Sequence, residues 1–286
     1  FLFCLILGPF FIKKLKQLKI GEVAKRDDCP ALDRFCAEKE GTPTMGGIFI
    51  LISVVLSVLL WADLSNRYVL LTLFTSLWLG VLGWIDDYMK LTKKGKRGLS
   101  REAKLMGQIF IGSFIGTYVY FNPDSTTQLN FPFFKNLIVD LGILYIPFVA
   151  LVVIGTSNAV NLTDGLDGLA IGCVLIVSLT LIILSYISGH VYLSKYLFIP
   201  FVSGAGELAV VCSAIAGASL GFLWFNCHPA SVFMGDVGSL SLGGTLGVVA
   251  AFIKQEIVLA IAGGIFVLEA LSVIIQSVKA ALPLPL

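Results

Sequence analysis

The sequence has few charged residues. Only 13% of its 286 residues are Asp, Glu, Lys or Arg, whereas 57% are hydrophobic and the mean hydropathy is +0.93. A soluble globular domain carries about 25% charged residues to keep its surface in water. The composition therefore excludes an ordinary soluble domain and predicts an integral membrane protein.

Other signals are also missing. A net charge of +2, from 20 Lys and Arg against 18 Asp and Glu, is too small to indicate a nucleic-acid-binding surface. The six cysteines form no CxxC pair, which argues against a zinc site and against a disulfide framework. Neither a Walker A sequence nor a GxGxxG sequence occurs, so we expect neither a nucleotide-driven pump nor a Rossmann domain.

Long apolar runs cover most of the chain. A membrane-spanning helix needs about 20 mainly apolar residues. After a shorter first run, 1–12, eight segments approach that length: 46–62, 68–85, 105–121, 137–160, 169–188, 208–225, 239–253 and 257–278. Because lipid tolerates no unpaired backbone groups and these runs are too long for barrel strands, we expect one all-α bundle, a single membrane-embedded domain over residues 1–286. The first run resembles a clipped helix, so we expect a fragment.

Basic residues collect in alternate connections. Sixteen of the 20 Lys and Arg lie between the first and second runs, between the third and fourth runs, or at Lys279. The other connections carry only Arg67, Lys135, Lys195 and Lys254. Since short basic loops stay in the cytoplasm, this bias fixes the orientation. Each spanning helix carries the chain across the membrane, so every second connection lies on the same side. This alternation, or parity, assigns two further connections to the cytoplasmic side, 161–168 and 226–238.

Three acidic stretches lie at the predicted cytoplasmic ends of helices. They are 86–90 (DDYMK), 158–168 (NAVNLTDGLDG) and 233–239 (FMGDVGS), and together they carry five aspartates. Carboxylates near the hydrocarbon boundary are costly unless they are paired, hydrated or metal-bound. Oxygen ligands without Cys or His are typical of Mg²⁺ or Mn²⁺. The neighbouring glycines 165, 168, 235 and 238 would let backbone N–H groups approach a phosphate. With Lys90 and Lys104, the pattern indicates a phosphoryl-transfer site.

Each of these residues also has a purely structural interpretation. Asp86 and Lys90 are spaced i,i+4 and could simply pair on a helix surface. Asp164 and Asp236 could be ordinary N-caps of the helices that follow. Glu269, inside the last apolar run, could face a functional cavity or hydrogen-bond a neighbouring helix, and 263–264 (GG) could permit a kink before it.

The motifs taken together resemble those of the polyprenyl-phosphate N-acetylhexosamine-1-phosphate transferases, in glycosyltransferase family 4. The matching strings follow the family order: GTPTMGG (41–47), DDxxK (86–90), 158–168, FNxxPA (225–230), FMGDVGS (233–239) and ExxSVI (269–274). The first string resembles the muramoyl branch, which transfers phospho-N-acetylmuramoyl-pentapeptide. Relatives that transfer N-acetylglucosamine phosphate carry a looser version of it.

The resemblance implies a Mg²⁺-dependent enzyme of the bacterial cytoplasmic (inner) membrane, with its active site on the cytoplasmic face. Its reaction would move phospho-MurNAc-pentapeptide from UDP to undecaprenyl phosphate, giving lipid I and UMP, the first membrane step of peptidoglycan synthesis. A homodimer is also implied.

The same resemblance implies roles for individual residues. Asp236 would bind magnesium together with Asp164, Asp86 would deprotonate the lipid phosphate, and Asp87 would lie beside it. Lys104, Asn161 and Asp164 match further catalytic positions. The substrate-binding positions would be Lys39, Thr44, Asn158, Gly165, Leu166, Asp167, Asn226 and Phe233, with the Phe233 ring stacking on the uracil base.

The chain also departs from the family. The family has ten helices and a loop with three consecutive histidines between the ninth and tenth, whereas this sequence stops at Leu286. We therefore expect about eight complete helices plus part of the first, and little activity from these 286 residues alone.

Other functions remain open at this point. One alternative is a transferase of another UDP-N-acetylhexosamine, for teichoic acid, O-antigen or N-glycan initiation. A second is a lipid or solute transporter, which would place polar sites near the midplane on broken helices. A passive scaffold is a third. Direct attack by the lipid phosphate and a two-step route through a carboxylate intermediate both fit the motifs.

Overall fold

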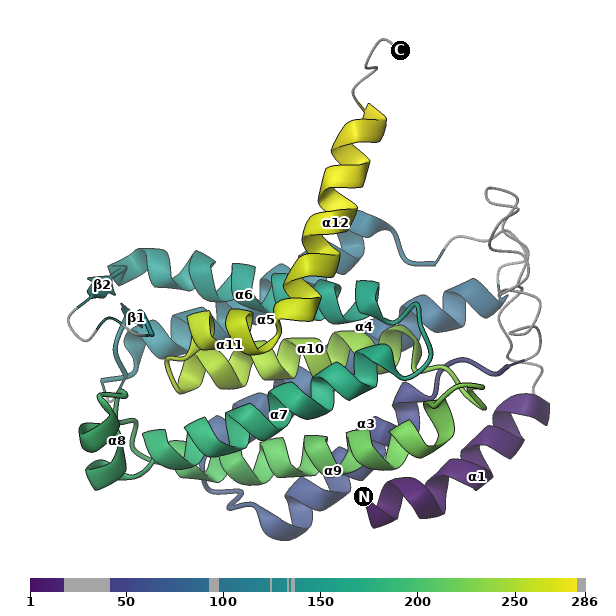
Figure 1. The fold of residues 1–286 in the computed structure, drawn as a ribbon, viewed down its shortest axis with the longest axis horizontal. Helices are drawn as coiled ribbons and strands as arrows, with labels where there is room; N and C mark the ends of the chain where they lie inside the picture. Colours follow the sequence, from purple (N-terminus) through teal and green to yellow (C-terminus); the bar gives the residue numbers. More distant parts are fainter. Residues whose placement is uncertain (18–41, 93–97, 124, 133, 135–136, 282–286) are drawn as a thin grey trace.

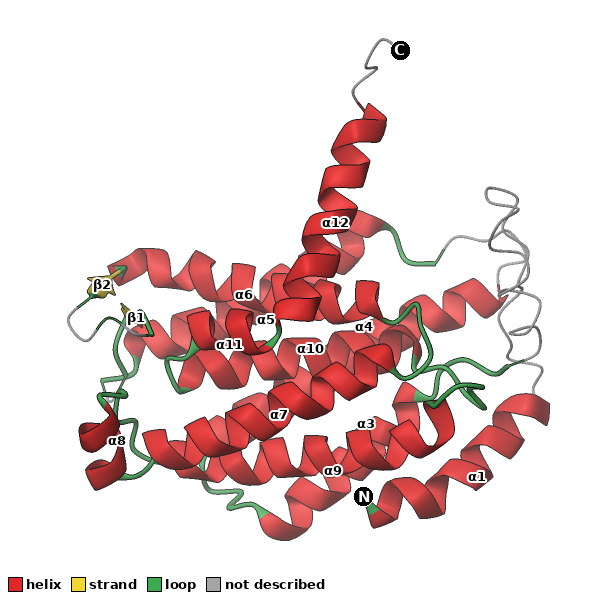
Figure 2. Cartoon of the chain, viewed as in Figure 1, coloured by secondary structure: helices red, strands yellow, loops and turns green. Residues whose placement is uncertain are grey.

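The computed structural model describes residues 1–17, 42–92, 98–123, 125–132, 134 and 137–281, and this part of the chain is almost wholly helical (Figures 1 and 2). The helices are α1 (Leu2–Gln17), α3 (Gly47–Trp61), α4 (Arg67–Thr92), α5 (Arg101–Phe121), α6 (Tyr145–Thr163), α7 (Leu169–Ser188), α8 (Val191–Leu197), α9 (Leu208–Asn226), α10 (Gly235–Phe252), α11 (Glu256–Ala262) and α12 (Gly264–Ala281). Two 3₁₀ turns, η2 (Gly142–Leu144) and η3 (Ala205–Glu207), precede α6 and α9. Strands β1 (Gln128–Asn130) and β2 (Ile138–Asp140) pair antiparallel, with Leu129 opposite Val139.

Five of the described helices are long and apolar enough to cross a membrane. They are α4, α7 and α10, together with the continuous segments Gly142–Thr163 and Ala205–Asn226. Helices α11 and α12 would form a sixth span, bent by 82° at the break between them, and α3 is a shorter apolar helix of 15 residues. The protein is therefore a multi-pass helical membrane protein, as its composition predicts.

Helix α10 is the central element of the bundle. Nearly all of its side chains are buried, and it packs most extensively on α4 and α6. Gly243 and Gly247 let α10 approach α6 closely, because a Cβ at Gly243 would lie 2.5 Å from the Thr156 carbonyl oxygen. The contact of α6 with α5 is equally close, because a Cβ at Gly112 of α5 would lie 2.6 Å from the Ala150 Cα. Small residues four apart are a typical means of packing helices in lipid, and here they bring α6 close to both α5 and α10.

Two predicted spans differ from the structure. The run 137–160 is not one helix, because residues 138–140 form β2 and α6 begins only at Tyr145. Asp140 accepts hydrogen bonds from the Thr127 hydroxyl and the Gly142 N–H, so local turn chemistry prevents a helix from starting there. Hydrophobicity alone cannot distinguish a short strand from the first turn of a helix.

The last predicted span is broken. The run 257–278 bends by 82° between α11 and α12, at the Gly-Gly pair, which confirms the expected kink. Helix α12 then projects away from the bundle (Figure 1). Glu269 lies half-buried on α12, and both interpretations of this acid remain predictions.

The bundle has two distinct ends. The β1–β2 hairpin and α8 lie at one end (left in Figure 1), whereas the last turns of α4 and the first turn of α10 lie at the other. The second end carries the acidic stretches, as the parity argument predicts.

Candidate active site

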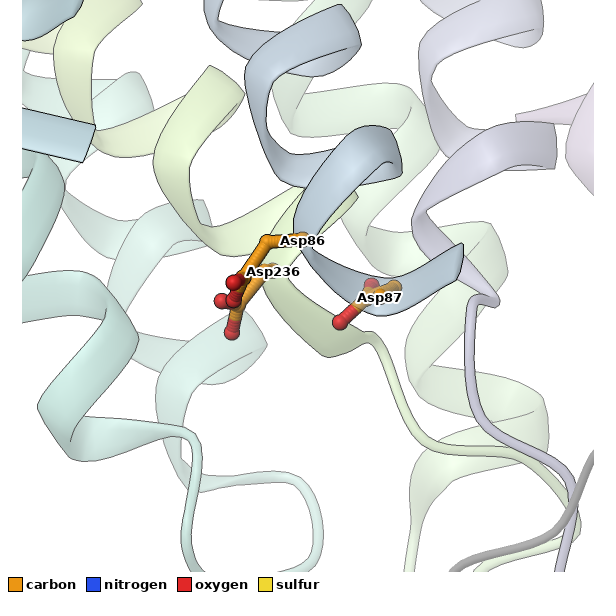
Figure 3. A group of neighbouring side chains, drawn as sticks. All are labelled: Asp86, Asp87 and Asp236. Carbon is orange, nitrogen blue, oxygen red and sulfur yellow. The ribbon is translucent and has the colours of Figure 1, made fainter. Parts of the chain in front are cut away.

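Three aspartates converge where α4 and α10 meet. Asp86 and Asp87 lie in the last turns of α4, and Asp236 lies in the first turn of α10 (Figure 3). One carboxylate oxygen from each lies within 4.8 Å of the others. All three residues are buried, with exposed fractions of 3%, 5% and 8%. Burying three like charges is costly without compensation, so the surrounding groups are decisive.

A glycine contact brings the two helices to this distance. Gly83 of α4 lies directly against the backbone of Asp236, and a Cβ at Gly83 would overlap the Asp236 carbonyl group. Asp86 and Asp87 follow Gly83 by three and four residues, so they lie on the same face one turn further along. The chain enters α10 through Gly235, which has a φ of +74° that favours glycine.

Acidic side chains also satisfy the first N–H groups of α10. The Gly235 N–H donates to Asp164 Oδ2 at 3.1 Å, and the Val237 N–H donates to Asp87 Oδ2 at 3.3 Å. Such N–H groups have no partner within their own helix. Asp164, the residue that follows α6, therefore caps α10 from a different segment of the chain rather than the helix that follows it in sequence.

Two lysines neutralise part of this charge. Lys90 Nζ lies 2.8 Å from Asp86 Oδ2 and 3.1 Å from Asp236 Oδ2. Lys104 Nζ, from α5, lies 2.6 Å from Asp236 Oδ2 and 3.5 Å from Asp86 Oδ2. The i,i+4 pair of Asp86 and Lys90 that the sequence suggested therefore does form, but Lys90 also reaches the aspartate of α10. Three carboxylates and two ammonium groups make up one connected cluster.

Amides hold the remaining carboxylate oxygens. Asn161 Nδ2 of α6 donates to Asp236 Oδ1 at 2.7 Å and to Ser239 Oγ at 2.7 Å. The Leu99 N–H donates to Asp86 Oδ1 at 2.6 Å. Asp236 therefore has one oxygen on the lysines and the other on Asn161, which fixes the rotamer of its carboxylate. The ordinary N-cap interpretation of Asp236 does not apply, because α10 begins at Gly235 and these oxygens bind side chains.

The connections beside the cluster are braced by Asn226 and Asp167. Asn226 accepts from the Gly168 N–H at 3.0 Å and donates to the Val232 carbonyl at 2.8 Å, so it joins the turn after α6 to the segment before α10. Asp167 Oδ2 lies 3.1 Å from His228 Nδ1 and accepts from the Ala230 N–H at 3.3 Å. The isolated position of His228 in the sequence gave no sign of this contact.

The 41–47 motif packs on the same region. Phe233 donates its N–H to the Pro43 carbonyl, and the Phe233 carbonyl accepts from the Gly46 N–H, both at 2.8 Å. Phe233 is half-buried, and Thr44 lies beside Gly235. Gly165 and Leu166 are exposed next to Asp164. The predicted substrate residue Lys39 lies outside the described residues, and the roles of the others remain predictions.

Asn158 lies deeper than the cluster. Its Nδ2 donates to Gln108 Oε1 of α5 at 3.0 Å and to the Ile154 carbonyl at 2.8 Å. Its side chain is therefore engaged between two helices, one turn below Asn161. The assignment of Asn158 to substrate binding remains a prediction.

The acidic residues could bind a metal ion. Three carboxylates within 4.8 Å, without a Cys or His ligand, form a donor set suited to a hard divalent cation. Asp236, a predicted ligand, belongs to this group. Asp164, the other predicted ligand, hydrogen-bonds the α10 N-terminus instead and remains a prediction.

The sequence of this chain is similar to those of known transferases. Residues 69–254 match the family described as Glycosyl transferase family 4, and residues 39–51 match phospho-N-acetylmuramoyl-pentapeptide-transferase signature 1. A protein of that name from Pelobacter propionicus is 54% identical over 275 residues, and one from Citrifermentans bemidjiense is 53% identical over 275 residues. Another from Desulforapulum autotrophicum is 52% identical over 276 residues. Each alignment covers 96% of this chain and 76% of the relative.

Proposed function

Because the chain belongs to the phospho-N-acetylmuramoyl-pentapeptide-transferase family, we propose that it transfers phospho-MurNAc-pentapeptide from UDP to undecaprenyl phosphate. The products are lipid I and UMP. The observation that carries the proposal is the cluster of Asp86, Asp87 and Asp236 with Lys90 and Lys104, all at one end of a membrane bundle. Transfer of this kind needs positioning and neutralised charge more than covalent chemistry by the protein.

The proposed reaction is a direct displacement. An oxygen of the lipid phosphate attacks the phosphorus that bears the sugar, and the bond from this phosphorus to the bridging oxygen breaks, so that UMP leaves with both bonding electrons. Asp86 accepts the proton of the lipid phosphate, as the family resemblance implies. The Leu99 N–H at one Asp86 oxygen and Lys90 at the other would orient this carboxylate for that role.

Lys90 and Lys104 would stabilise the anionic groups during this step. Both ammonium groups lie within 3.5 Å of Asp86 and Asp236, so each is oriented before any substrate arrives. A preoriented charge needs no reorganisation when negative charge moves to the leaving group. Asn161 supports the arrangement by holding Asp236 from the opposite side.

We propose Mg²⁺ as the cofactor. Asp236 is the ligand favoured by both the sequence motif and the donor geometry, and Asp86 and Asp87 complete the carboxylate group. When bound, the ion would neutralise charge on the diphosphate and on the departing UMP. Asp164 is retained as a ligand from the family resemblance alone.

The site would face the cytoplasm of a bacterial inner membrane, where the nucleotide arrives from solution and the lipid acceptor arrives from the bilayer. The basic connections support this orientation. The substrate-binding residues that the resemblance implies, including Asp167, Asn226 and Phe233, would hold the UDP moiety. A homodimer and a single domain are further proposals from the same resemblance. The transporter alternative is weaker, because the charged cluster lies at the bundle end rather than near its middle.

A release assay tests the proposal. Full-length protein in detergent would be mixed with UDP-MurNAc-pentapeptide and undecaprenyl phosphate, with and without Mg²⁺, and UMP would be quantified. We expect UMP only when donor, acceptor and Mg²⁺ are all present, and none when UDP-N-acetylglucosamine replaces the donor. A stoichiometric burst of UMP without acceptor would contradict direct attack, and turnover of UDP-N-acetylglucosamine would favour the other transferase class.

A further inference from the structure

A buried glutamine joins α5 to α6 below the carboxylate cluster. Gln108 of α5 is only 1% exposed, so its polar side chain is buried inside the bundle. Its Nε2 donates to Ser157 Oγ at 3.0 Å, and its Oε1 accepts from Asn158 Nδ2 at 3.0 Å. A buried amide is costly unless both its ends are satisfied. Here both ends are satisfied by consecutive residues of one neighbouring helix.

The contact of Gln108 with α6 lies directly below two residues of the carboxylate cluster. Gln108 lies four residues after Lys104 on α5, so the two side chains share one face of the helix. On α6, Asn158 lies three residues before Asn161, again on a shared face. Lys104 and Asn161 are the residues that bind opposite oxygens of Asp236, at 2.6 and 2.7 Å. The Gln108 contact therefore lies one turn below both of them.

Glycines of α5 bring this helix into close contact with α6. A Cβ at Gly116 would lie 2.8 Å from the Ile146 carbonyl oxygen, and Gly112 is equally close to Ala150. Glycine surfaces let two helices approach but offer few side chains to interlock. The Gln108 carboxamide donates to Ser157 and accepts from Asn158. Only one register of α5 against α6 satisfies both hydrogen bonds. Sliding α5 along α6 would leave buried polar groups without partners.

We propose that Gln108 is a positioning residue of the transferase. It fixes α5 against α6 so that the Lys104 ammonium and the Asn161 amide meet the Asp236 carboxylate from opposite sides. The inference rests on the proposed function, because it assigns a catalytic consequence to this register. Gln108 itself touches neither the carboxylate cluster nor, as we propose, the substrates.

The test is a substitution of similar size without hydrogen bonds. In full-length protein, Gln108→Met is expected to lower kcat roughly tenfold, with the KM for the UDP donor changed less than twofold, because small displacements of positioned groups act on the transition state. Gln108→Glu is expected to recover most of the rate, since a neutral carboxyl group there again offers one donor and one acceptor. Ser76→Ala is the matched control, because it removes a similarly buried hydrogen bond to Ser241 between α4 and α10, ten residues before Asp86 on α4.

A second background separates positioning from general destabilisation. If Gln108 acts through Lys104, then Gln108→Met should cost less than threefold in a Lys104→Ala background, where the group to be positioned is gone. An unchanged kcat in the single variant, or an equal loss in both backgrounds, would overturn the proposal. If Gln108→Met does not fold, Ser157→Ala decides the matter: a two- to fivefold lower kcat supports the role, and an unchanged kcat refutes it.

The assay also distinguishes failure of this inference from failure of the proposed function. Wild-type protein that makes lipid I while Gln108→Met retains full kcat would refute only the positioning role. Wild-type protein without transferase activity would instead refute the proposed function.

Discussion

Lys104 Nζ and Asp236 Oδ2 lie 2.6 Å apart, although 132 residues separate them in the sequence. The pair joins the beginning of α5 to the beginning of α10. Asn161 of α6 holds the other Asp236 oxygen at 2.7 Å. Lys90 of α4 also lies 3.1 Å from Asp236 Oδ2. Four helices are therefore tied together at one carboxylate, and the phosphoryl-transfer chemistry is proposed to take place at this junction.

Removing the Lys104 ammonium should abolish most turnover. We expect Lys104→Ala to lower kcat about 10²- to 10³-fold, the range typical of a lost preorganised charge or donor at a transition state. The measurement is steady-state lipid I formation by purified full-length protein. Lys195→Ala is the control, because Lys195 is exposed on α8 at the opposite end of the bundle. Equal activities of the two variants would contradict the role of Lys104.

Gly83 should tolerate no side chain. Gly→Ala inside a helix usually stabilises by about 0.5–1 kcal/mol, but a Cβ at Gly83 would overlap the Asp236 carbonyl. Overpacking of this kind costs about 1–3 kcal/mol. We expect Gly83→Ala to lower both the melting temperature and kcat, because α4 must move away from α10.

Gly155 of α6 provides the comparison for that substitution. It is also helical, but among the described residues no atom beyond the adjoining backbone of its own helix lies within 4 Å of the position that its Cβ would occupy. Gly155→Ala should therefore keep wild-type activity and a melting temperature at or above that of the wild type. A Gly83→Ala protein as stable and active as Gly155→Ala would show that the α4–α10 contact is looser than described.

The sequence predicts the class of fold and the end of the bundle that carries the site. Apolar run length identifies most helices, and the alternation of basic connections assigns 86–90, 158–168 and 233–239 to one end. That assignment works because counting the membrane crossings gives the side on which each connection lies. Counting crossings gives no distances. The structure is needed to show that Gly83 contacts Asp236, which brings Asp86 and Asp87 close to Asp236.

Other features are invisible to sequence reasoning for identifiable reasons. A single Gln108 in an apolar run has no spacing signature, and its partners Ser157 and Asn158 come from another helix. His228 is isolated in the sequence and meets Asp167 only through the fold. Residues 137–139 are as apolar as the helix that follows them, and the turn at Asp140 decides their conformation.

A second buried polar cluster, at the opposite end, should affect stability rather than catalysis. The Tyr145 hydroxyl accepts from Lys254 Nζ at 3.0 Å and donates to Glu256 Oε1, and all three residues are buried. Tyr145→Phe leaves two buried charged groups without this partner, which should cost about 1–3 kcal/mol. We expect a lower melting temperature and a kcat within twofold of wild type. The control is Tyr192→Phe on the exposed face of α8.

An unchanged melting temperature for Tyr145→Phe would mean that the hydroxyl makes no net contribution. A large fall in kcat with an unchanged melting temperature would instead connect this end of the bundle to the chemistry.

Cys227 offers a natural probe of orientation. It is exposed in the segment between α9 and α10, whereas Cys4, Cys173 and Cys212 are buried. In a background with Cys29→Ser and Cys36→Ser, a membrane-impermeant maleimide should label Cys227 in inverted membrane vesicles and not in right-side-out vesicles. A Lys195→Cys probe in a Cys227→Ser background should show the reverse pattern. Labelling of Cys227 only from the outside would refute the cytoplasmic assignment of the site.

The most direct test of the account is the effect of Asp236→Asn on lipid I formation at saturating donor, acceptor and Mg²⁺. The change removes one negative charge while keeping nearly the same side-chain shape. We predict that kcat falls at least 100-fold while the melting temperature stays within a few degrees of the wild type. A folded Asp236→Asn protein with a kcat within threefold of the wild type would contradict the claim that the carboxylate junction of α4, α5, α6 and α10 is where transfer takes place.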